Sequence, residues 1–380
     1  MIILIAPNSF KESLSSSQAA EIMGRACRRV FPRAEIILFP LADGGEGTID
    51  VANRVMGGAF RTVRVRDPLG RTKTARWLKK GTTAVIEMAQ ASGLSLVEPE
   101  RRNPLTTTSY GTGELIRDAL KAGCRDITIG LGGSATNDAG AGALEALGVS
   151  FLGPGGTRFR YITGADIVRI SRIDISGIMP EVARARFTIL ADCRNRFSGK
   201  EGASYVYAPQ KGASAEMVRN LDKGLRNFAR LVEKTVGKDI ESAPGSGAAG
   251  GMGGGFHAFL DARILSGAET LMRLGMFEAQ VKRTDLILTG EGRIDRQTFS
   301  GKTLGLLFHE AETRKIPLIA MAGSIDPAIR SRLQDAPLCA FSILPGPLDL
   351  PAALRDAERF LLDATEEALK AVRAGLSLKR

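Results

Sequence analysis

The chain has 380 residues, a length that suggests two domains and a substantial core, so a peptide hormone or an isolated binding motif is excluded. Hydrophobic residues make up 44% of the chain and charged residues 24%, a balance typical of globular proteins and not of disordered or membrane proteins. The 52 lysines and arginines outnumber the 41 acidic residues, and the formal charge of +11 fits either a nucleic-acid surface or an acidic small-molecule substrate.

Strands and helices alternate at both ends of the chain. An apolar run over Ile2–Ala6 predicts a strand, the stretch from about Ser15 to Val30 predicts a helix, and Glu35–Pro40 predicts a second strand. Towards the other end we predict three strands and a last helix, at Asp285–Thr289, Leu318–Ala322, Ala340–Leu344 and about Pro351 to Val372. This alternation is typical of an α/β sheet.

The middle of the chain has a different pattern. Short alternating segments between Phe60 and Val97 are separated by turns, which predicts a largely antiparallel patch. A helix over Gly113–Ala122 and a strand over Asp126–Gly130 follow. Ala215–Val236 is predicted to be a long amphipathic helix whose apolar stripe belongs to the core.

These patterns predict an α/β fold with two domains. The first is a discontinuous flavodoxin-like or Rossmann-like domain formed by residues 1–61 and 282–380. The second is a mixed α/β domain over residues 62–281, inserted into the first.

Glycine is the unusual feature of the composition. The 44 glycines are nearly twice the roughly 7% found on average, and they come in blocks, which indicates turns where backbone N–H groups approach a ligand. The loop after the strand Asp126–Gly130 combines glycines with hydroxyl and amide donors suited to phosphate at a helix N-terminus: Gly132, Gly133, Ser134, Thr136 and Asn137. A second block offers Gly251, Gly253 and Gly254 as another phosphate cradle.

Carboxylates follow several predicted strands, at the edge where α/β sheets bind ligands. Asp43, Asp192 and Asp295 are such residues, and phosphoryl transfer needs carboxylate oxygens for Mg²⁺ and a base for the acceptor hydroxyl. Lys11 and Lys302 could neutralise phosphate charge. The layout therefore suits phosphoryl transfer.

Two other functions stay open at this point. An NAD-dependent hydroxy-acid dehydrogenase is favoured by the G-x-G-x-x-A match at Gly130, Gly132 and Ala135, but the next acidic residue, Asp166, lies too far along the chain to bind a ribose. A basic nucleic-acid-associated protein is favoured by the charge of +11. Dispersed cations and an aromatic content of 6% count against it.

The cellular compartment is predicted from the few cysteines and histidines and from the absence of targeting and membrane-spanning segments. The four cysteines lie far apart, and the two histidines are too few for a histidine-based metal cluster. The N-terminal residues lack the basic region of a signal peptide, and no run of about 18 apolar residues occurs. We predict a cytoplasmic protein, monomeric or homodimeric, with a small-molecule substrate and without a nucleic-acid or membrane partner.

Seven ordered motifs resemble the bacterial class I glycerate kinase family. They are A-P-N-S-F-K at 6–11, A-D-G-G-E-G-T at 42–48, G-T-G-E-L-I from 111, G-L-G-G-S-A-T-N-D at 130–138, P-Q-K-G-A-S at 209–214, G-A-A-G-G-M-G at 247–253 and T-G-E-G-R-I-D at 289–295. The resemblance implies ATP-dependent phosphorylation of D-glycerate with Mg²⁺, at the 2-hydroxyl, to give 2-phosphoglycerate. It also implies a flavodoxin-like domain interrupted by a second domain.

The resemblance and the residue patterns together give a hypothesis for the site. We expect Asp192, Lys302 and Lys11 to be catalytic and the two glycine segments to hold ATP, while the residues expected to bind substrate are Ser9, Asp43, Arg293 and Asp295. The expected Mg²⁺ ligands are Asp43, Asp192 and Asp295. This chain departs from the family in carrying Asn8 where an aspartate is common, and R-N-R-F-S-G after Asp192.

Overall fold

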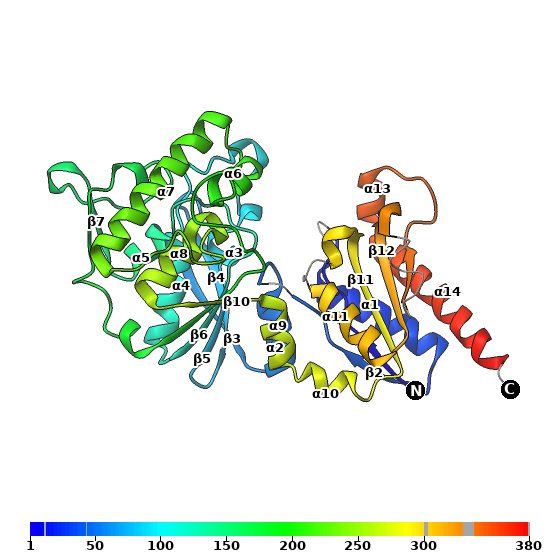
Figure 1. Ribbon diagram of the computed structural model, residues 1–380. Coiled ribbons are helices and arrows are strands. Elements are labelled where there is room, and N and C mark those ends of the chain that lie inside the picture. The colour runs from blue at the N-terminus through cyan, green and yellow to red at the C-terminus, as the bar shows by residue number, and fades with distance from the viewer. Residues whose placement is uncertain (11–12, 43, 300–302, 330–337, 379–380) are drawn as a thin grey trace. The chain divides into compact units, whose positions relative to one another are not determined.

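The computed structural model describes residues 1–10, 13–42, 44–299, 303–329 and 338–378 (Figure 1). The chain divides into two compact units, which we call unit 1 (Met1–Ala42 and Ala268–Arg380) and unit 2 (Asp43–Gly267). Residues 43–61 therefore go with unit 2 and residues 268–281 with unit 1, unlike the predicted boundaries at 61/62 and 281/282. The division into two domains stays a prediction.

Unit 1 contains a five-stranded sheet in which every pair of neighbours is parallel. Its strands are β1 (Ile2–Ile5), β2 (Glu35–Leu38), β11 (Leu286–Ile294), β12 (Leu318–Ile325) and β13 (Leu338–Ser342). The spatial order β13-β12-β11-β1-β2 is the flavodoxin-like order 2-1-3-4-5 when these five strands are counted along the chain. Ligands of such sheets bind beyond the carboxyl ends of β1 and β11, where the strand order reverses.

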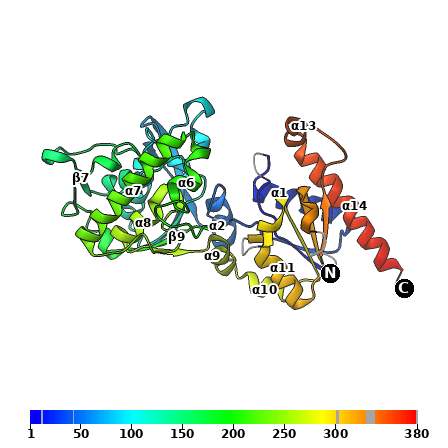
Figure 2. The ribbon, with the colours of Figure 1, turned by 45° about the horizontal axis from the view of Figure 1, so that its top comes forward.

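Helices cover both faces of this sheet because successive strand residues point to opposite sides. Ile3 and Ile5 pack on one face and Leu4 and Ala6 on the other. The helices of the unit are α1 (Ser16–Val30), α9 (Gly267–Leu274), α10 (Phe277–Val281), α11 (Thr303–Arg314), α13 (Leu350–Arg355) and α14 (Ala357–Ser377), with 3₁₀ turns η7 (Arg296–Phe299) and η8 (Pro327–Ile329). Helices α1 and α14 pack together on the Ile3 face, and α10 and α11 lie on the Leu4 face (Figure 2).

Unit 2 contains a six-stranded sheet of mixed direction. Its strands are β3 (Ala59–Arg66), β4 (Thr72–Lys80), β5 (Thr83–Glu87), β6 (Asp126–Gly130), β9 (Arg186–Leu190) and β10 (Arg263–Leu265), in the order β10-β9-β6-β5-β4-β3. The pairs β3–β4 and β4–β5 are antiparallel, which confirms the predicted antiparallel patch. The pairs β5–β6, β6–β9 and β9–β10 are parallel, so these four strands end at one edge.

The core of unit 2 lies between this sheet and its helices. Ile127 and Ile129 of β6 share one cluster of buried residues with Leu225 and Phe228 of α7. The helices are α2 (Thr48–Met56), α3 (Ala89–Ser92), α4 (Tyr110–Lys121), α5 (Ala141–Ala146), α6 (Ala203–Tyr207), α7 (Ala215–Val236) and α8 (Ala248–Leu260). Six 3₁₀ turns, η1 to η6, lie at Leu94–Leu96, Pro99–Arg101, Pro154–Gly156, Ile167–Arg169, Val182–Arg184 and Pro209–Lys211, and β7 (Ser150–Leu152) pairs with β8 (Arg172–Asp174).

The mixed α/β fold class predicted from the sequence is confirmed. The strand Asp126–Gly130 and the helix Ala215–Val236 have the predicted bounds. Among the described residues, no helix combines the length and apolar character needed to cross a membrane.

Close packing between helices yields a first testable prediction. A Cβ at Gly113 in α4 would lie 2.2 Å from the carbonyl oxygen of Ala143, whereas a Cβ at Gly375 in α14 would meet no atom within 4 Å. We expect Gly113→Ala to lower the free energy of unfolding by about 2 kcal/mol, because the overlap outweighs the better helix propensity of alanine. Gly375→Ala is the matched control and should raise it by up to about 1 kcal/mol. Urea titration of both variants measures the difference, and equal effects would contradict it.

Candidate active site

The carboxyl ends of the parallel strands in unit 2 define one edge of the sheet. Strand β5 ends at Glu87, β6 ends at Gly130 and β9 ends at Leu190, and neighbouring strands pair in register up to these residues. Because ligands of α/β proteins bind beyond this edge, the loops that follow these strands form the candidate site.

Two glycine motifs distant in sequence pack backbone against backbone at this edge. A Cβ at Gly130 would lie 2.4 Å from the Gly44 carbonyl oxygen, and a Cβ at Gly132 would lie 2.3 Å from the Gly45 Cα. The Gly132 N–H donates to the Gly44 carbonyl at 2.9 Å. Side chains at these positions would separate the segments, so glycine is required for the contact itself.

The loop after β6 carries the residues predicted to hold phosphate. The Ser134 hydroxyl accepts a hydrogen bond from Lys211, and the Asn137 amide donates to the Ser204 hydroxyl at 3.1 Å. The Thr136 Oγ1 and the Asn137 Oδ1 are buried and have no hydrogen-bond partner among the described residues. Since buried polar atoms are normally paired, these two atoms mark a place where a ligand or water is expected.

The helix N-terminus beside this loop is already occupied by the protein. The buried Asp138 carboxylate accepts hydrogen bonds from the N–H groups of Gly140 and Gly142 at the start of α5 and from the hydroxyl and N–H of Ser109. Asp138 thus takes these N–H groups of α5, and the expectation that a helix N-terminus serves the phosphate stays a prediction. The Gly133 and Ser134 N–H groups, in contrast, have no acceptor within the described parts of the chain.

The second glycine segment lies within the bounds of α8, whose backbone is not helical at Ala249, Gly250 and Gly251. Gly251 has a φ of +89°, and a Cβ at Gly251 or Gly254 would overlap the Phe197 ring. A Cβ at Gly253 would lie 2.6 Å from the Gly245 carbonyl oxygen. Close packing accounts for these glycines, and their assignment to the nucleotide stays a prediction.

Asp192 lies two residues beyond the end of β9 in a defined environment. Its Oδ1 accepts hydrogen bonds from the Ser266 hydroxyl at 3.0 Å and from the Gly267 N–H at 2.9 Å. The carboxylate therefore holds Ser266 and Gly267, at the end of unit 2, in addition to any chemical role.

The remaining predicted residues that the structure describes lie in unit 1. The Asn8 N–H donates to the Gly290 carbonyl at 2.8 Å, so Asn8 and the neighbouring Ser9 follow β1 beside the middle of β11, between the two strands where the strand order reverses. Arg293 Nε lies 3.6 Å from Asp295 Oδ2. The structure thus brings Arg293 and Asp295 together as an ion pair.

Three predicted residues, Lys11, Asp43 and Lys302, lie outside the described residues. Within the described ranges, no three aspartate, glutamate, histidine or cysteine side chains gather into a metal-binding group. Mg²⁺ bound to a nucleotide needs only one or two protein carboxylates in addition to phosphate oxygens, so the donors present are of the right chemical type.

Sequence reasoning missed two buried ionisable residues at this edge. Glu87 accepts hydrogen bonds from the N–H groups of Gly47 and Ile49, and burial raises the pKa of its carboxyl to about 7. Lys211 is 2% exposed, and burial lowers the pKa of its amine to about 7. Two features of the sequence could have identified them: Glu87 is a carboxylate at the end of an apolar segment, and Lys211 precedes a glycine in the motif at 209–214.

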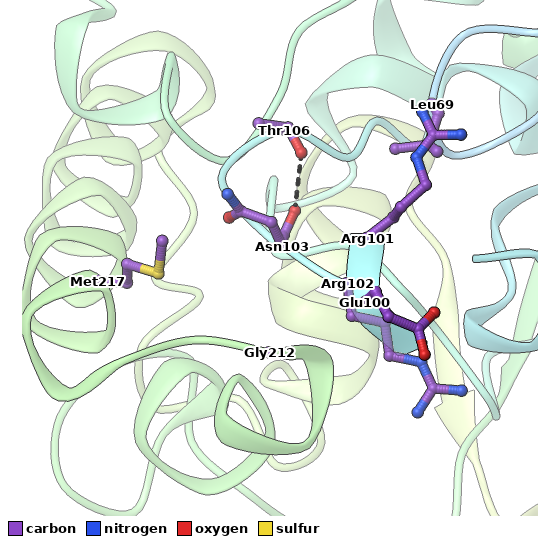
Figure 3. Close-up of a pocket in the computed structure, with 8 residues that line it drawn as sticks. All are labelled: Leu69, Glu100, Arg101, Arg102, Asn103, Thr106, Gly212 and Met217. Atoms are coloured by element: carbon purple, nitrogen blue, oxygen red, sulfur yellow. Dashed lines mark hydrogen bonds between the residues drawn. The ribbon is translucent and has the colours of Figure 1, made fainter. Parts of the chain in front are cut away.

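A groove of about 370 Å³ is lined in part by Gly212, the residue after Lys211. Its lining, drawn in Figure 3, is Leu69, Glu100, Arg101, Arg102, Asn103, Thr106, Gly212 and Met217. The charged lining residues are Glu100, Arg101 and Arg102, and none of the residues predicted to form the site lines this groove, so the candidate site stays at the strand edge.

A glycine loop at the carboxyl edge of a parallel sheet is the arrangement of phosphate-binding α/β proteins. Comparison with known proteins gives the family. The model of the glycerate kinase family matches residues 3–373, and the chain belongs to this family. The resemblance based on the seven motifs is thereby confirmed.

Individual relatives agree over nearly their whole lengths. A protein named glycerate kinase from Halalkalibacterium halodurans is 43% identical over 364 residues, which cover 95% of this chain and 96% of that protein. A protein named glycerate 2-kinase from Escherichia coli is 41% identical over 359 residues, 94% of each chain. A crystal structure of a protein assigned as glycerate kinase 2 from Salmonella typhimurium LT2 matches with a TM-score of 0.84 and 39% identity over 99% of each chain.

The raised pKa of Glu87 predicts a pH-dependent contribution to stability. The folded carboxyl keeps its proton up to about pH 7, whereas the unfolded carboxyl loses it near pH 4.5, so this stabilisation is present below pH 4.5 and is lost as the pH rises to 7. The side chain of the Glu87→Gln variant does not ionise in this pH range. We expect the free energy of unfolding of the wild type, relative to the variant, to fall by about 3 kcal/mol over this range.

Urea titrations at several pH values between 5 and 8 measure this difference. Glu233→Gln, at an exposed position of α7, is the matched control and should keep the wild-type pH dependence. A difference between wild type and Glu87→Gln that stays constant with pH would show that Glu87 does not hold its proton in the folded protein.

Proposed function

We propose that this protein is a glycerate kinase that transfers the γ-phosphoryl group of ATP to the 2-hydroxyl of D-glycerate, giving 2-phosphoglycerate and ADP. The observation that carries the proposal is the family match over residues 3–373, together with a relative named for the 2-position. We further propose a cytoplasmic location, because the cytoplasm supplies ATP. Membership in a kinase family lends no support to the dehydrogenase or nucleic-acid alternatives.

The loop after β6 is the proposed site for the ATP phosphates. Gly132 and Gly133 let the backbone approach closely, and the N–H groups of Gly133 and Ser134 are proposed to donate to phosphate oxygens. The Thr136 Oγ1 is proposed to donate as well, which would give this buried hydroxyl the partner it otherwise lacks. Binding in this manner depends on backbone geometry more than on side-chain charge.

The acceptor side of the reaction is proposed to depend on charged residues. Asp192 would accept the proton of the glycerate hydroxyl or hold Mg²⁺, and Arg293 with Ser9 would bind the glycerate carboxylate. Lys11 and Lys302 would stabilise the charge that develops on the transferred group. The Arg293–Asp295 ion pair would orient the guanidinium for this contact.

Mg²⁺ is proposed to enter with the nucleotide and to neutralise phosphate charge. Asp43, Asp192 and Asp295 are its proposed protein ligands. Oxygen donors of this kind suit Mg²⁺ and not zinc.

Product analysis tests the function directly. We expect the purified protein to convert ATP, Mg²⁺ and D-glycerate into ADP and 2-phosphoglycerate, identified by phosphorus NMR. Excess EDTA should abolish turnover and added Mg²⁺ should restore it. Release of ADP at the same rate with and without glycerate would refute the proposal, and 3-phosphoglycerate as the product would refute its position-specific part.

The role of Asp192 can be separated from its contacts with Ser266 and Gly267. Asp192→Asn keeps an oxygen that can accept from Ser266 and Gly267 but removes the negative charge, and we expect kcat to fall at least ~100-fold with the thermal stability retained. Ser266→Ala removes one hydrogen bond to the same carboxylate and leaves the charge, so kcat should change less than ~5-fold. Equal losses of kcat in both variants would make Asp192 a structural residue.

A further inference from the structure

Lys211 is a lysine enclosed by protein. It ends the 3₁₀ turn η6, and its side chain is among the largest that are fully buried. The next residue, Gly212, has a φ of +91°, and a Cβ there would lie 2.0 Å from the carbonyl oxygen of Arg102. The turn is therefore packed against the backbone at Arg102, and the Lys211 side chain lies in the interior.

The Lys211 amine serves the loop after β6 and no carboxylate. Its Nζ donates to the Ser134 hydroxyl at 2.8 Å and to the Thr136 carbonyl oxygen at 2.7 Å. No ion pair between Lys211 and an aspartate or glutamate is found among the described residues, and the electrostatic effects of Asp138 and Cys193 on the pKa of the amine are smaller than that of burial. Burying an amine without an ion pair is unfavourable, so an apolar side chain would give a more stable structure unless the amine has a further role.

The atoms beside these contacts point to a ligand. The Thr136 Oγ1, the Asn137 Oδ1 and the Ser246 Oγ are buried without hydrogen-bond partners in the described structure. The segment of Ser246 reaches this loop through Gly250, whose carbonyl accepts from the Ala139 N–H and whose Cβ position lies 2.2 Å from the Thr136 carbonyl oxygen. Unpaired polar atoms therefore occur both on the loop and on the segment that packs against it.

We propose that Lys211 is a positioning residue for nucleotide binding: by fixing Ser134 and the Thr136 carbonyl, it holds the loop after β6 in the conformation that binds the phosphate groups of ATP. This inference rests on the proposed function. Peptide planarity explains how the amine acts, because the Thr136 carbonyl and the Asn137 N–H belong to one trans peptide and point in opposite directions. When the Thr136 carbonyl is fixed towards Lys211, the Asn137 N–H must point away from Lys211.

Electrostatic attraction supports the same role, because a bound polyphosphate would favour the protonated form of an amine whose pKa burial lowers to about 7. An ammonium group close behind the loop attracts polyphosphate, and in a buried setting this attraction is weakly screened by solvent. Glycerate, which carries a single carboxylate, is not expected at this loop. Loss of Lys211 should therefore affect nucleotide binding selectively.

The test compares Lys211→Met with Lys234→Met, the same substitution at an exposed position of α7. We expect Lys211→Met to raise the dissociation constant for Mg²⁺-ATP at least ~10-fold, since the two hydrogen bonds that order the loop are lost. The KM for D-glycerate should change less than ~2-fold, and thermal stability should not decrease. Lys234→Met should leave all three quantities unchanged.

A second variant covers the case in which Lys211→Met does not fold. Ser134→Ala removes one of the two acceptors and should weaken Mg²⁺-ATP binding by ~3-fold or more. Where both variants fold, the double variant should bind no more weakly than Lys211→Met, because Lys211 acts through this loop.

Three results would overturn the inference. They are wild-type affinity for Mg²⁺-ATP in a folded Lys211→Met, equal losses for nucleotide and glycerate in that variant, and unchanged affinity in Ser134→Ala when Lys211→Met does not fold. Absence of Mg²⁺-ATP binding by the wild type would refute the proposed function and this inference with it. Wild-type binding that the variants retain would refute the inference alone.

Discussion

The candidate site of unit 2 depends on the close approach of backbones that carry no side chains. Gly44 and Gly45 lie against Gly130 and Gly132, at distances that leave no room for a Cβ. This contact joins the motifs at 42–48 and 130–138 into one structure at the carboxyl edge of the sheet. It also explains why the loop after β6 can present backbone N–H groups, since side chains do not screen them.

A backbone packed in this way leaves polar groups inside the protein, and buried ionisable residues satisfy them. Glu87 accepts from the N–H groups of Gly47 and Ile49, and Asp138 accepts from those of Gly140 and Gly142. Lys211 acts as a donor where these carboxylates act as acceptors, because its amine donates hydrogen bonds to the loop after β6. Burial opposes ionisation in all three residues, so the ordered site is maintained at the expense of stability.

Local sequence patterns predicted the elements better than the contacts between them. The strand Asp126–Gly130 and the helix Ala215–Val236 were predictable, because alternation and helical periodicity repeat within the segment. The roles of Glu87 and Lys211 were not, because each depends on partners more than 35 residues away. The loop residues were predicted as a group, whereas the use of the α5 N-terminus by Asp138 follows only from the fold.

The end of β9 links the candidate site to the places where the chain enters and leaves unit 2. Gly44, just after the entry, packs against the Leu190 carbonyl, and a Cβ there would lie 2.6 Å from that oxygen. Gly267, the last residue of the unit, donates its N–H to Asp192. A carboxylate held by two donors has little freedom to reorient, which is what proton transfer or metal binding at a fixed position requires. The contacts that anchor the chain at β9 therefore also hold the carboxylate that we propose for the chemistry, so this one residue would serve both stability and activity.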